Sequence, residues 1–138
     1  MFKWLVAGLL VLLMTGSCAA GEIHIIFWTI ENCGPCHKAH NELESDDTYN
    51  SWNPETVDPD KLKTPDEKEF FKYMKVKSFP TFIIYKELTI NGATYIVEMG
   101  RLEGYTTKES FLNNVKRIAA GSNAGGGGSP RTFIKRRK

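Results

Sequence analysis

The chain has 138 residues, of which 41% are hydrophobic and 25% are charged, a composition typical of one globular domain with short extensions. Its three cysteines are too few for a small domain held together mainly by disulfides. The net charge of +2 hides an asymmetry, because residues 131–138 hold five basic residues and no acid. With Lys3 also set aside, 12 basic and 16 acidic residues remain in the body. This acidic body excludes a basic nucleic-acid-binding domain, so we expect no nucleic-acid partner.

Residues 1–20 have the composition of an export signal. Lys3 precedes an unbroken apolar run over residues 4–14, which is shorter than the roughly 20 apolar residues of a membrane-spanning helix. Three outcomes are open: cleavage after Ala20, acylation of Cys18 as in a bacterial lipoprotein, or retention as a membrane anchor. Thr15 stands where the lipoprotein pattern prefers leucine. All three outcomes predict an exported body, in the periplasm, outside the cell or anchored facing outward, where disulfide chemistry is permitted.

The sequence pattern of residues 22–121 predicts one domain that begins with a strand. Residues 23–28 form a nearly continuous apolar run, as expected of a strand buried on both faces. A helix over about 35–44 and a weak strand at 55–58 follow. Thr64 and Glu67 flank Pro65 in a capping-box pattern, which predicts a helix to about residue 74. We expect this helix to bury Phe70, Phe71 and Met74.

The second half of the domain predicts two strands and a helix. Residues 81–85 have the pattern of a buried strand, and Asn91-Gly92 predicts a type I′ hairpin turn between 86–90 and 93–99. The last helix is expected to begin at Thr106, with Glu109 completing a second capping box, and to end at Gly121. Its apolar side chains fall on one stripe: Phe111, Leu112, Val115, Ile118 and Ala119.

Residues 122–138 predict a flexible glycine-rich linker followed by a basic tail. Four consecutive glycines occupy 125–128, a composition that an engineered linker would share. The tail is either solvated or in contact with an anionic membrane surface, which attracts Lys and Arg.

The motif that carries chemistry is Cys33-Gly34-Pro35-Cys36, which lies between the first strand and the first helix. Two residues between the cysteines allow their sulfurs to bond within one turn. The unpaired N–H groups and the dipole at a helix N-terminus favour a thiolate, which is the attacking form of cysteine. We therefore expect Cys33, on the exposed side of the turn, to be a nucleophile of lowered pKa. Cys36, inside the first turn, is expected to resolve the mixed disulfide.

Two other chemistries fit the same residues. A zinc site would need a second ligand pair, and only His24, His37 and His40 could contribute to one. Cys33, Cys36 and His37 also match the c-type haem attachment pattern, with Met74 or Met99 as a further iron ligand. The buried strand before the motif and the strands after it favour a redox turn instead, so we expect no metal and no cofactor.

These motifs resemble the thioredoxin family. The resemblance rests on Phe27-Trp28, on the CGPC turn, and on residues 76–82 with Phe79-Pro80-Thr81, where Pro80 follows Cys36 by 44 residues. It covers roughly residues 22–121 and implies an α/β thioredoxin-like fold, a central mixed β-sheet with helices on both faces. It further implies a cis bond at Pro80, with Phe79 and Pro80 binding an extended substrate segment across the cysteines.

The sequence departs from the family pattern in three places. Asn32 replaces the usual Trp before the first cysteine, and one extra residue separates Phe27-Trp28 from the pair. The family's buried Asp, which assists proton transfer at the second cysteine, aligns with Ile26. Glu31, His37 or His24 are candidate substitutes. An acidic segment over 42–60 is also longer than is usual for the family.

We therefore expect an exported, monomeric thiol–disulfide oxidoreductase acting on protein cysteines through Cys33 and Cys36. The CGPC turn resembles that of the reducing members, which favours a reductase over an oxidase or isomerase. Such a reductase needs a thiol electron donor that the sequence does not identify. The alternatives are a c-type haem electron carrier and a non-catalytic binding module on the same scaffold.

Overall fold

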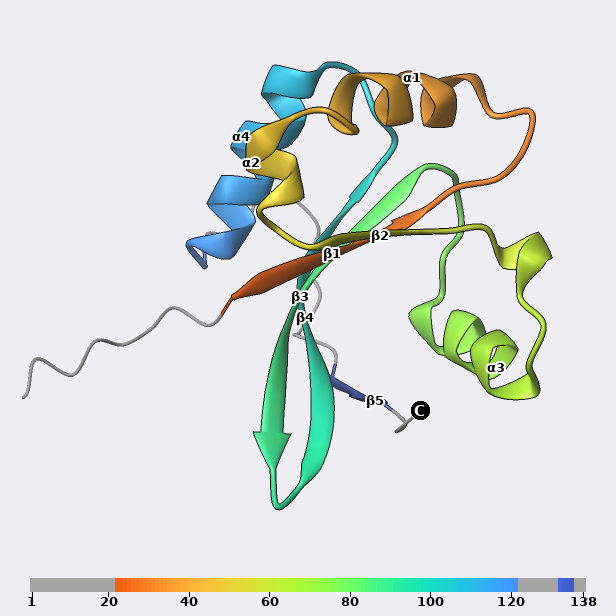
Figure 1. Ribbon diagram of the computed structural model, residues 1–138, viewed down its shortest axis with the longest axis vertical. Helices are drawn as coiled ribbons and strands as arrows, with labels where there is room; N and C mark the ends of the chain where they lie inside the picture. The colour runs from red at the N-terminus through yellow and green to blue at the C-terminus, as the bar shows by residue number, and fades with distance from the viewer. Residues whose placement is uncertain (1–21, 122–131, 136–138) are drawn as a thin grey trace, which may run out of the picture.

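The computed structural model describes residues 22–121 and 132–135. Its centre is a five-stranded sheet of order β2-β1-β3-β4-β5. β1 (Ile23–Trp28) pairs in parallel with β2 (Pro54–Val57), and all other neighbours are antiparallel. The remaining strands are β3 (Thr81–Ile90), β4 (Ala93–Glu103) and β5 (Thr132–Lys135). The predicted mixed sheet with helices on both faces is confirmed (Figure 1).

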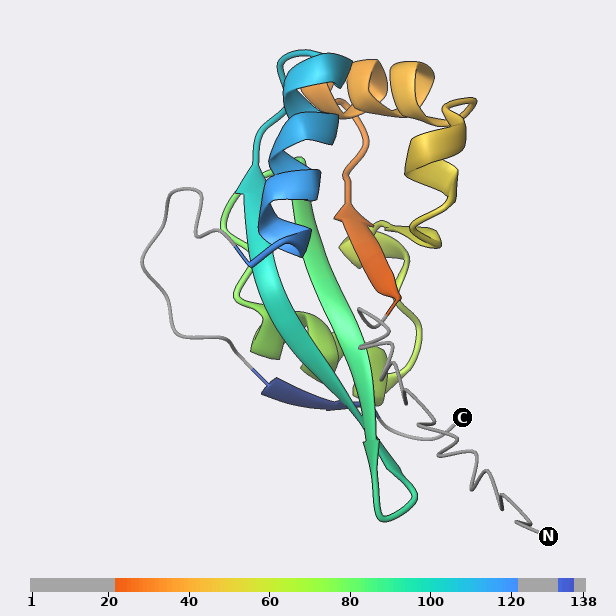
Figure 2. The same ribbon diagram turned by 90° about the vertical axis from the view of Figure 1, so that its left-hand side faces the viewer.

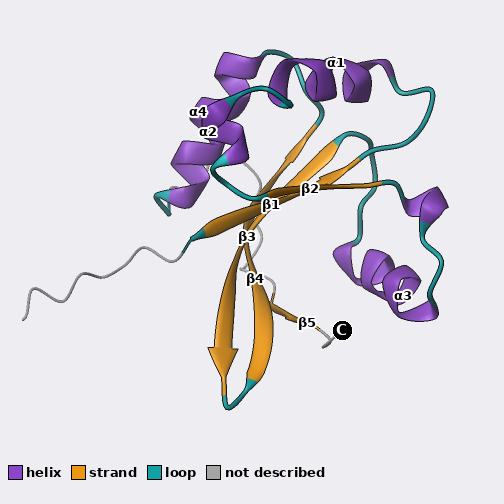
Figure 3. Cartoon of the chain, in the orientation of Figure 1, coloured by secondary structure: helices purple, strands orange, loops and turns teal. Residues whose placement is uncertain are grey.

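Helices cover both faces of the sheet. One face carries α1 (Gly34–Leu43), the short α2 (Asp47–Asn50) and α4 (Lys108–Ala119), and the other carries α3 (Pro65–Met74), as Figures 1 and 3 show. A 3₁₀ turn, η1 (Pro59–Lys61), links β2 to α3. No helix among the described residues is long and apolar enough to cross a membrane.

Two apolar clusters correspond to the two faces. Strand residues alternate sides, so Ile25 and Phe27 join the cluster beneath α1 and α4, whereas Ile26 and Trp28 join Met74 in the cluster beneath α3. This alternation explains why residues 23–28 form a continuous apolar run: each neighbour enters a different core. The cysteine pair belongs to the first cluster.

The predicted capping box of α3 is present. The Glu67 backbone N–H donates to Thr64 Oγ1 at 3.2 Å, and the Glu67 carboxylate accepts from the Thr64 backbone N–H at 3.0 Å. Met74 is fully buried, whereas Phe70 and Phe71 are only partly buried. The end of α3 is therefore held more deeply in the core than its middle.

The predicted cap of the last helix is wrong by one residue. Thr107, not Thr106, is the N-cap, because its side chain accepts the Ser110 backbone N–H at 3.2 Å. With this register Glu109 is the second helical residue, so it does not close a capping box. The predicted stop at Gly121 is confirmed, and its φ of 83° suits glycine.

The hairpin prediction is confirmed at Asn91 and Gly92, whose φ values are 49° and 77° as a type I′ turn requires. Two elements were not expected. One is α2 in the acidic segment, which Asp46 caps by accepting the Tyr49 N–H at 2.9 Å. The other is β5: residues 122–138 were assigned entirely to linker and tail, but residues 132–135 pair with β4.

Candidate active site

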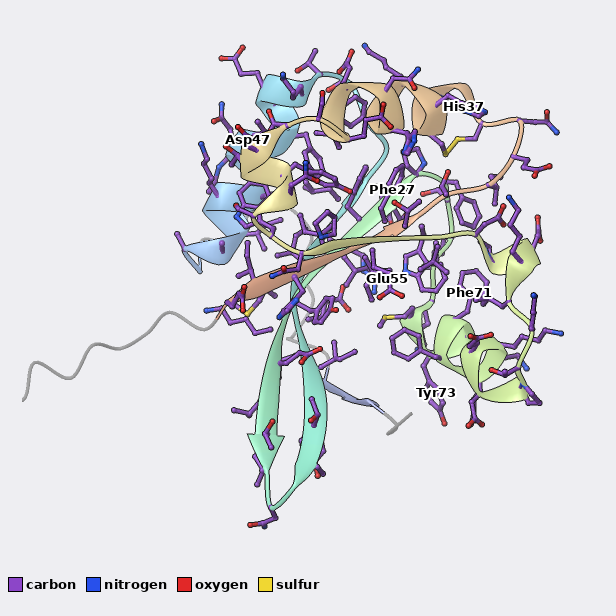
Figure 4. All side chains as sticks on the ribbon, viewed as in Figure 1. Phe27, His37, Asp47, Glu55, Phe71 and Tyr73 are labelled. Carbon is purple, nitrogen blue, oxygen red and sulfur yellow. A yellow bond between two sulfur atoms is a disulfide. The ribbon has the colours of Figure 1, made fainter. Side chains whose placement is uncertain are left out.

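The cysteines lie after the loop that follows β1, at the N-terminus of α1. Cys33 is the N-cap of α1, Pro35 lies in its first turn and needs no hydrogen-bond acceptor there, and the Cys36 backbone N–H donates to Cys33 Sγ at 3.2 Å. The two sulfurs are bonded to each other at 2.08 Å, and Figure 4 shows this bond beside His37. Cys33 Sγ thus both caps α1 and forms the disulfide bond with Cys36.

The two cysteines differ in accessibility. Cys33 retains 9% of its surface and Cys36 only 2%, so the pair is more buried than the sequence analysis expected, while the order of exposure is the expected one. An incoming sulfur meets Cys33 first. Around Cys33 the residues Asn32, Gly34 and Pro35 are exposed, and Asn32 has a positive φ of 57°.

A proline loop lies beside the pair. The Phe79–Pro80 bond is cis, as the resemblance implied, and Pro80 is fully buried. Phe79 packs against the cluster that contains both cysteines and also against the α3 cluster. The loop is fixed on both sides, because the Gly104 N–H donates to the Pro80 carbonyl at 2.7 Å and Thr81 Oγ1 donates to the Ser78 carbonyl at 2.7 Å.

The segment after β4 is a part of this site that the sequence analysis missed. Besides the bond from Gly104, it contacts α1: Lys38 Nζ donates to the Thr106 carbonyl and the Tyr105 hydroxyl donates to Glu42, both at 2.6 Å. Burial, together with the bond to Glu42, raises the pKa of the Tyr105 phenol. No local motif could have indicated these contacts, because they join residues more than 60 positions apart.

Ile26 stands directly before Phe27-Trp28, where the family has its buried acid, and the structure shows which way its side chain points. Ile26 faces α3, on the side of the sheet away from the cysteines. The β1 residue on the cysteine side at this level is Phe27, which packs in the same cluster as Cys36 and lines the same cavity. Successive residues of a strand point to opposite faces, so Ile26 and Phe27 cannot both face the cysteines.

A cavity of about 540 Å³ opens beside Cys36. Its polar lining includes Glu31, Asp58, Lys61, His37 and His40. Lys61 Nζ lies 3.2 Å from Glu31 Oε1 and 3.7 Å from Asp58 Oδ2 and so links the active-site loop to η1. The hydrogen bond that Lys61 donates to Glu31 raises the pKa of the Lys61 ammonium group. His40 Nε2 lies 3.0 Å from Glu44 Oε2, one helical turn beyond Cys36.

Of the proposed substitutes for the buried acid, Glu31 and His37 therefore reach the cavity, and His24 does not. His24 stacks on Tyr85, with ring centroids 5.2 Å apart, and Tyr85 belongs to the α3 face. Met74, considered as a haem ligand, is buried on that same face, away from His37. Among the described residues no group of three His, Cys, Asp or Glu side chains could hold a metal ion. Cys18 lies outside the described residues.

Comparisons with known proteins agree with this geometry. A thioredoxin-like domain model matches residues 18–119. A thioredoxin from Thermus thermophilus is 23% identical over 76% of this chain and 79% of that one, with a TM-score of 0.54. A thioredoxin-fold protein from Helicobacter pylori is 13% identical over 73% and 71%, with a TM-score of 0.55. A Malassezia sympodialis thioredoxin is 16% identical over 72% and 76%, with a TM-score of 0.51.

These likenesses to solved structures show the fold, and the family model covers most of the chain. A comparison with curated proteins gives no match. The CxxC pair stands in the thioredoxin-like arrangement, at the N-terminus of α1 and beside a cis-proline loop. The chain belongs to the thioredoxin-like domain family, with Cys33 and Cys36 as its cysteine pair.

Proposed function

We propose that this domain is a protein disulfide reductase that works outside the cytoplasm, with Cys33 as nucleophile and Cys36 as resolving cysteine. A thioredoxin-like domain with a CxxC pair is a thiol–disulfide oxidoreductase in general terms. The observation that carries the proposal is the Cys36 N–H aimed at Cys33 Sγ across the first turn of α1. In the reduced protein this N–H and the helix N-terminus stabilise a thiolate on Cys33.

The reaction proceeds in two exchanges. The Cys33 thiolate attacks one sulfur of a substrate disulfide, which forms a mixed disulfide and releases the other substrate sulfur as a thiolate. The Cys36 thiol then loses its proton and attacks Cys33 Sγ, which expels the second substrate thiolate and closes the Cys33–Cys36 bond. The substrate gains two electrons and, at neutral pH, two protons. A dithiol electron donor must then reduce the pair again.

The proton of Cys36 leaves without the help of a carboxylate on β1, because Phe27 occupies the cysteine side of that strand. We assign the alternative exit to the cavity beside Cys36, because His37, His40 and Glu31 line it. Glu31 already pairs with Lys61 and His40 with Glu44, so His37 is the side chain that we assign to receive this proton. Resolution by Cys36 is accordingly expected to be slower than in a thioredoxin with a buried acid.

Substrate binding is proposed at the exposed surface around Cys33. An extended segment lying across the cysteine would meet Phe79 on one side and the exposed turn of Gly34 and Pro35 on the other. Pro80 has no backbone N–H, so it presents no donor that would compete for the sulfurs.

The deciding measurement is the reduction potential of the pair in the full chain, titrated in defined thiol–disulfide buffers. A potential near about −270 mV supports a reductase, whereas one near about −120 to −180 mV would make the protein an oxidant or isomerase. Cys33→Ser is the control and should abolish the two-electron transition. A Cys36→Ser variant should accumulate a mixed disulfide with substrate, and failure to trap one would contradict the assigned roles.

Export is a separate part of the proposal and depends on residues 1–20, which lie outside the described residues. The intact mass of the protein purified from its native host distinguishes the three outcomes. Loss of residues 1–20 indicates cleavage after Ala20, and a lipid mass on a chain that begins at Cys18 indicates a lipoprotein. An unmodified full-length chain recovered from the membrane fraction indicates an anchor, whereas one recovered from the cytoplasm would overturn the proposal of export.

A further inference from the structure

The chain between α3 and the cis-proline loop is rich in lysine. Residues 70–86 include four lysines and no acid. Two of these lysines, Lys75 and Lys77, are exposed and lie in residues 75–80, which join the end of α3 to the start of β3. Figures 1 and 2 show this connection running to the end of the sheet where α1 begins. We call Lys75 and Lys77 the lysine pair.

The backbone that carries the lysine pair is held on both sides. Arg101 donates to the Lys75 carbonyl at 3.4 Å, and Val76 packs against the cluster beneath α3. On the other side, Thr81 Oγ1 donates to the Ser78 carbonyl at 2.7 Å. Within residues 22–121, neither ammonium group of the lysine pair makes an ion pair. The loop therefore presents two positive charges from a fixed backbone.

The lysine pair lies within reach of a segment bound at Phe79. Lys77 is two residues from Phe79, so their Cα atoms are at most about 7 Å apart, and for Lys75 the limit is about 14 Å. Phe79 packs against the cluster that contains Cys33. A substrate segment that crosses Phe79 to present its disulfide to Cys33 therefore passes beside the lysine pair.

The acids beside this loop leave the lysine pair unneutralised. Glu98, the buried acid of β4, binds Arg101 at 2.6 and 2.9 Å, and Glu31 of the active-site loop pairs with Lys61. Glu103 is exposed at the end of β4, opposite the first residue of β3, and so offsets part of the positive charge. The loop before Phe79 is thus locally positive, although the body as a whole is acidic.

The other face of the sheet offers the opposite charge. The end of α1 and the start of α2 carry four acids within residues 42–47, namely Glu42, Glu44, Asp46 and Asp47. An acidic substrate segment is therefore repelled from the α1–α2 side and attracted to the lysine pair. This difference gives such a segment one preferred orientation across Cys33.

We infer that the lysine pair selects substrate proteins that carry Asp or Glu within about four residues of the cysteine to be reduced. The carboxylate pairs with Lys77 or Lys75 while the neighbouring backbone crosses Phe79. Exposed charges at the rim of an interface mainly speed association, and salt screens them. This specificity rests on the reductase activity proposed for Cys33, and the lysine pair takes no part in the exchange of sulfur bonds.

The test mixes the reduced full chain with peptide disulfides and measures the rate of the first exchange. Two peptides differ only beside the cysteine, where one has Asp and Glu and the other has Asn and Gln. We expect the acidic peptide to react at least about threefold faster at low salt, and this preference should disappear at about 0.5 M salt. Lys75→Gln/Lys77→Gln should abolish the preference, and Lys75→Glu/Lys77→Glu should reverse it.

A matched control separates the lysine pair from general charge. Lys63→Gln/Lys68→Gln removes two other exposed lysines, near the start of α3, and should keep the preference for the acidic peptide. The inference is overturned if the unmodified chain shows no preference or if the control variant loses as much of it as Lys75→Gln/Lys77→Gln. It is also overturned if Lys75→Gln/Lys77→Gln slows both peptides equally, which would indicate a structural role of the loop.

A binding measurement distinguishes failure of this inference from failure of the proposed reductase. The oxidised full chain cannot exchange with an acidic peptide in which serine replaces cysteine, so amide chemical shifts then report docking alone. We expect this peptide to shift the amides of residues 75–79, and Lys75→Gln/Lys77→Gln should remove these shifts. Lysine-dependent shifts without reduction of the peptide disulfides would contradict the reductase and leave acidic docking intact. Reduction of both peptides at equal rates would overturn the inference and leave the reductase intact.

Discussion

Arg101 connects β4 to the end of α3, and its replacement should destabilise the domain strongly. Its guanidinium binds both carboxylate oxygens of Glu98, at 2.6 and 2.9 Å, and donates to the backbone carbonyls of Met74 at 2.9 Å and Lys75 at 3.4 Å. These carbonyls belong to the last turn of α3, which has no further helical N–H to offer them. Four residues beyond Lys75 the chain reaches the cis-proline loop, so this contact also anchors the route to the active site.

The size of the effect follows from burial. Glu98 retains only 6% of its surface, so Arg101→Met leaves a buried carboxylate without its partner. Removing one partner of a buried ion pair costs about 3–5 kcal/mol. Replacing both partners, in Glu98→Leu/Arg101→Met, removes the unpaired charge and leaves only the two α3 carbonyls without a donor, a loss of about 1–3 kcal/mol. The double variant should therefore be more stable than the single one.

Urea denaturation of the oxidised protein, followed by circular dichroism, measures the free energy of unfolding for each variant. The disulfide must remain intact throughout, because its reduction would break two-state behaviour. A loss of less than about 1 kcal/mol in Arg101→Met, typical of a surface ion pair, would refute the reasoning. So would a double variant that is no more stable than Arg101→Met alone, since the unpaired Glu98 charge would then not be the cause.

Three further predictions concern stability. Thr107→Ala should lower the free energy of unfolding by about 1 kcal/mol through loss of the α4 cap, whereas Thr106→Ala should lower it by less than half as much; equal losses in urea titrations would contradict the observed cap. Gly100→Ala should cost about 1–3 kcal/mol, because its methyl group would lie 2.9 Å from Ile118 Cγ2, and adding Ile118→Ala should relieve the clash so that the two losses are not additive in a double-mutant cycle. Burial raises the pKa of the Tyr85 phenol to about 12, so the unfolded chain ionises first and stability is lost as the pH rises from about 10 through 12. Thermal unfolding at pH 9 and pH 11 should show a smaller drop for Tyr85→Phe than for the unmodified chain, and an equal drop would show that Tyr85 is not the titrating group.

Local sequence signals determined the elements whose stabilising contacts are also local. The capping box of Thr64 and Glu67, the positive-φ turn at Asn91-Gly92 and the stop at Gly121 each depend on residues within a few positions of one another, and each is present. The CGPC turn belongs to the same class, because its chemistry needs only a strand end and a helix start. The missed cap at Thr107 shows the limit: two adjacent threonines offer nearly equal caps, and the packing of α4 selects one.

The tertiary structure alone decided which residues face the cysteines. Ile26 stands directly before Phe27-Trp28, where the family has its buried acid, but the pairing of β1 with β2 and β3 turns Ile26 toward α3 and Phe27 toward the cysteines. The contacts of Gly104 with Pro80 and of Tyr105 with Glu42 join distant segments and leave no local pattern. β5 likewise exists only because β4 offers it an edge, which a sequence reading of a short basic segment cannot supply.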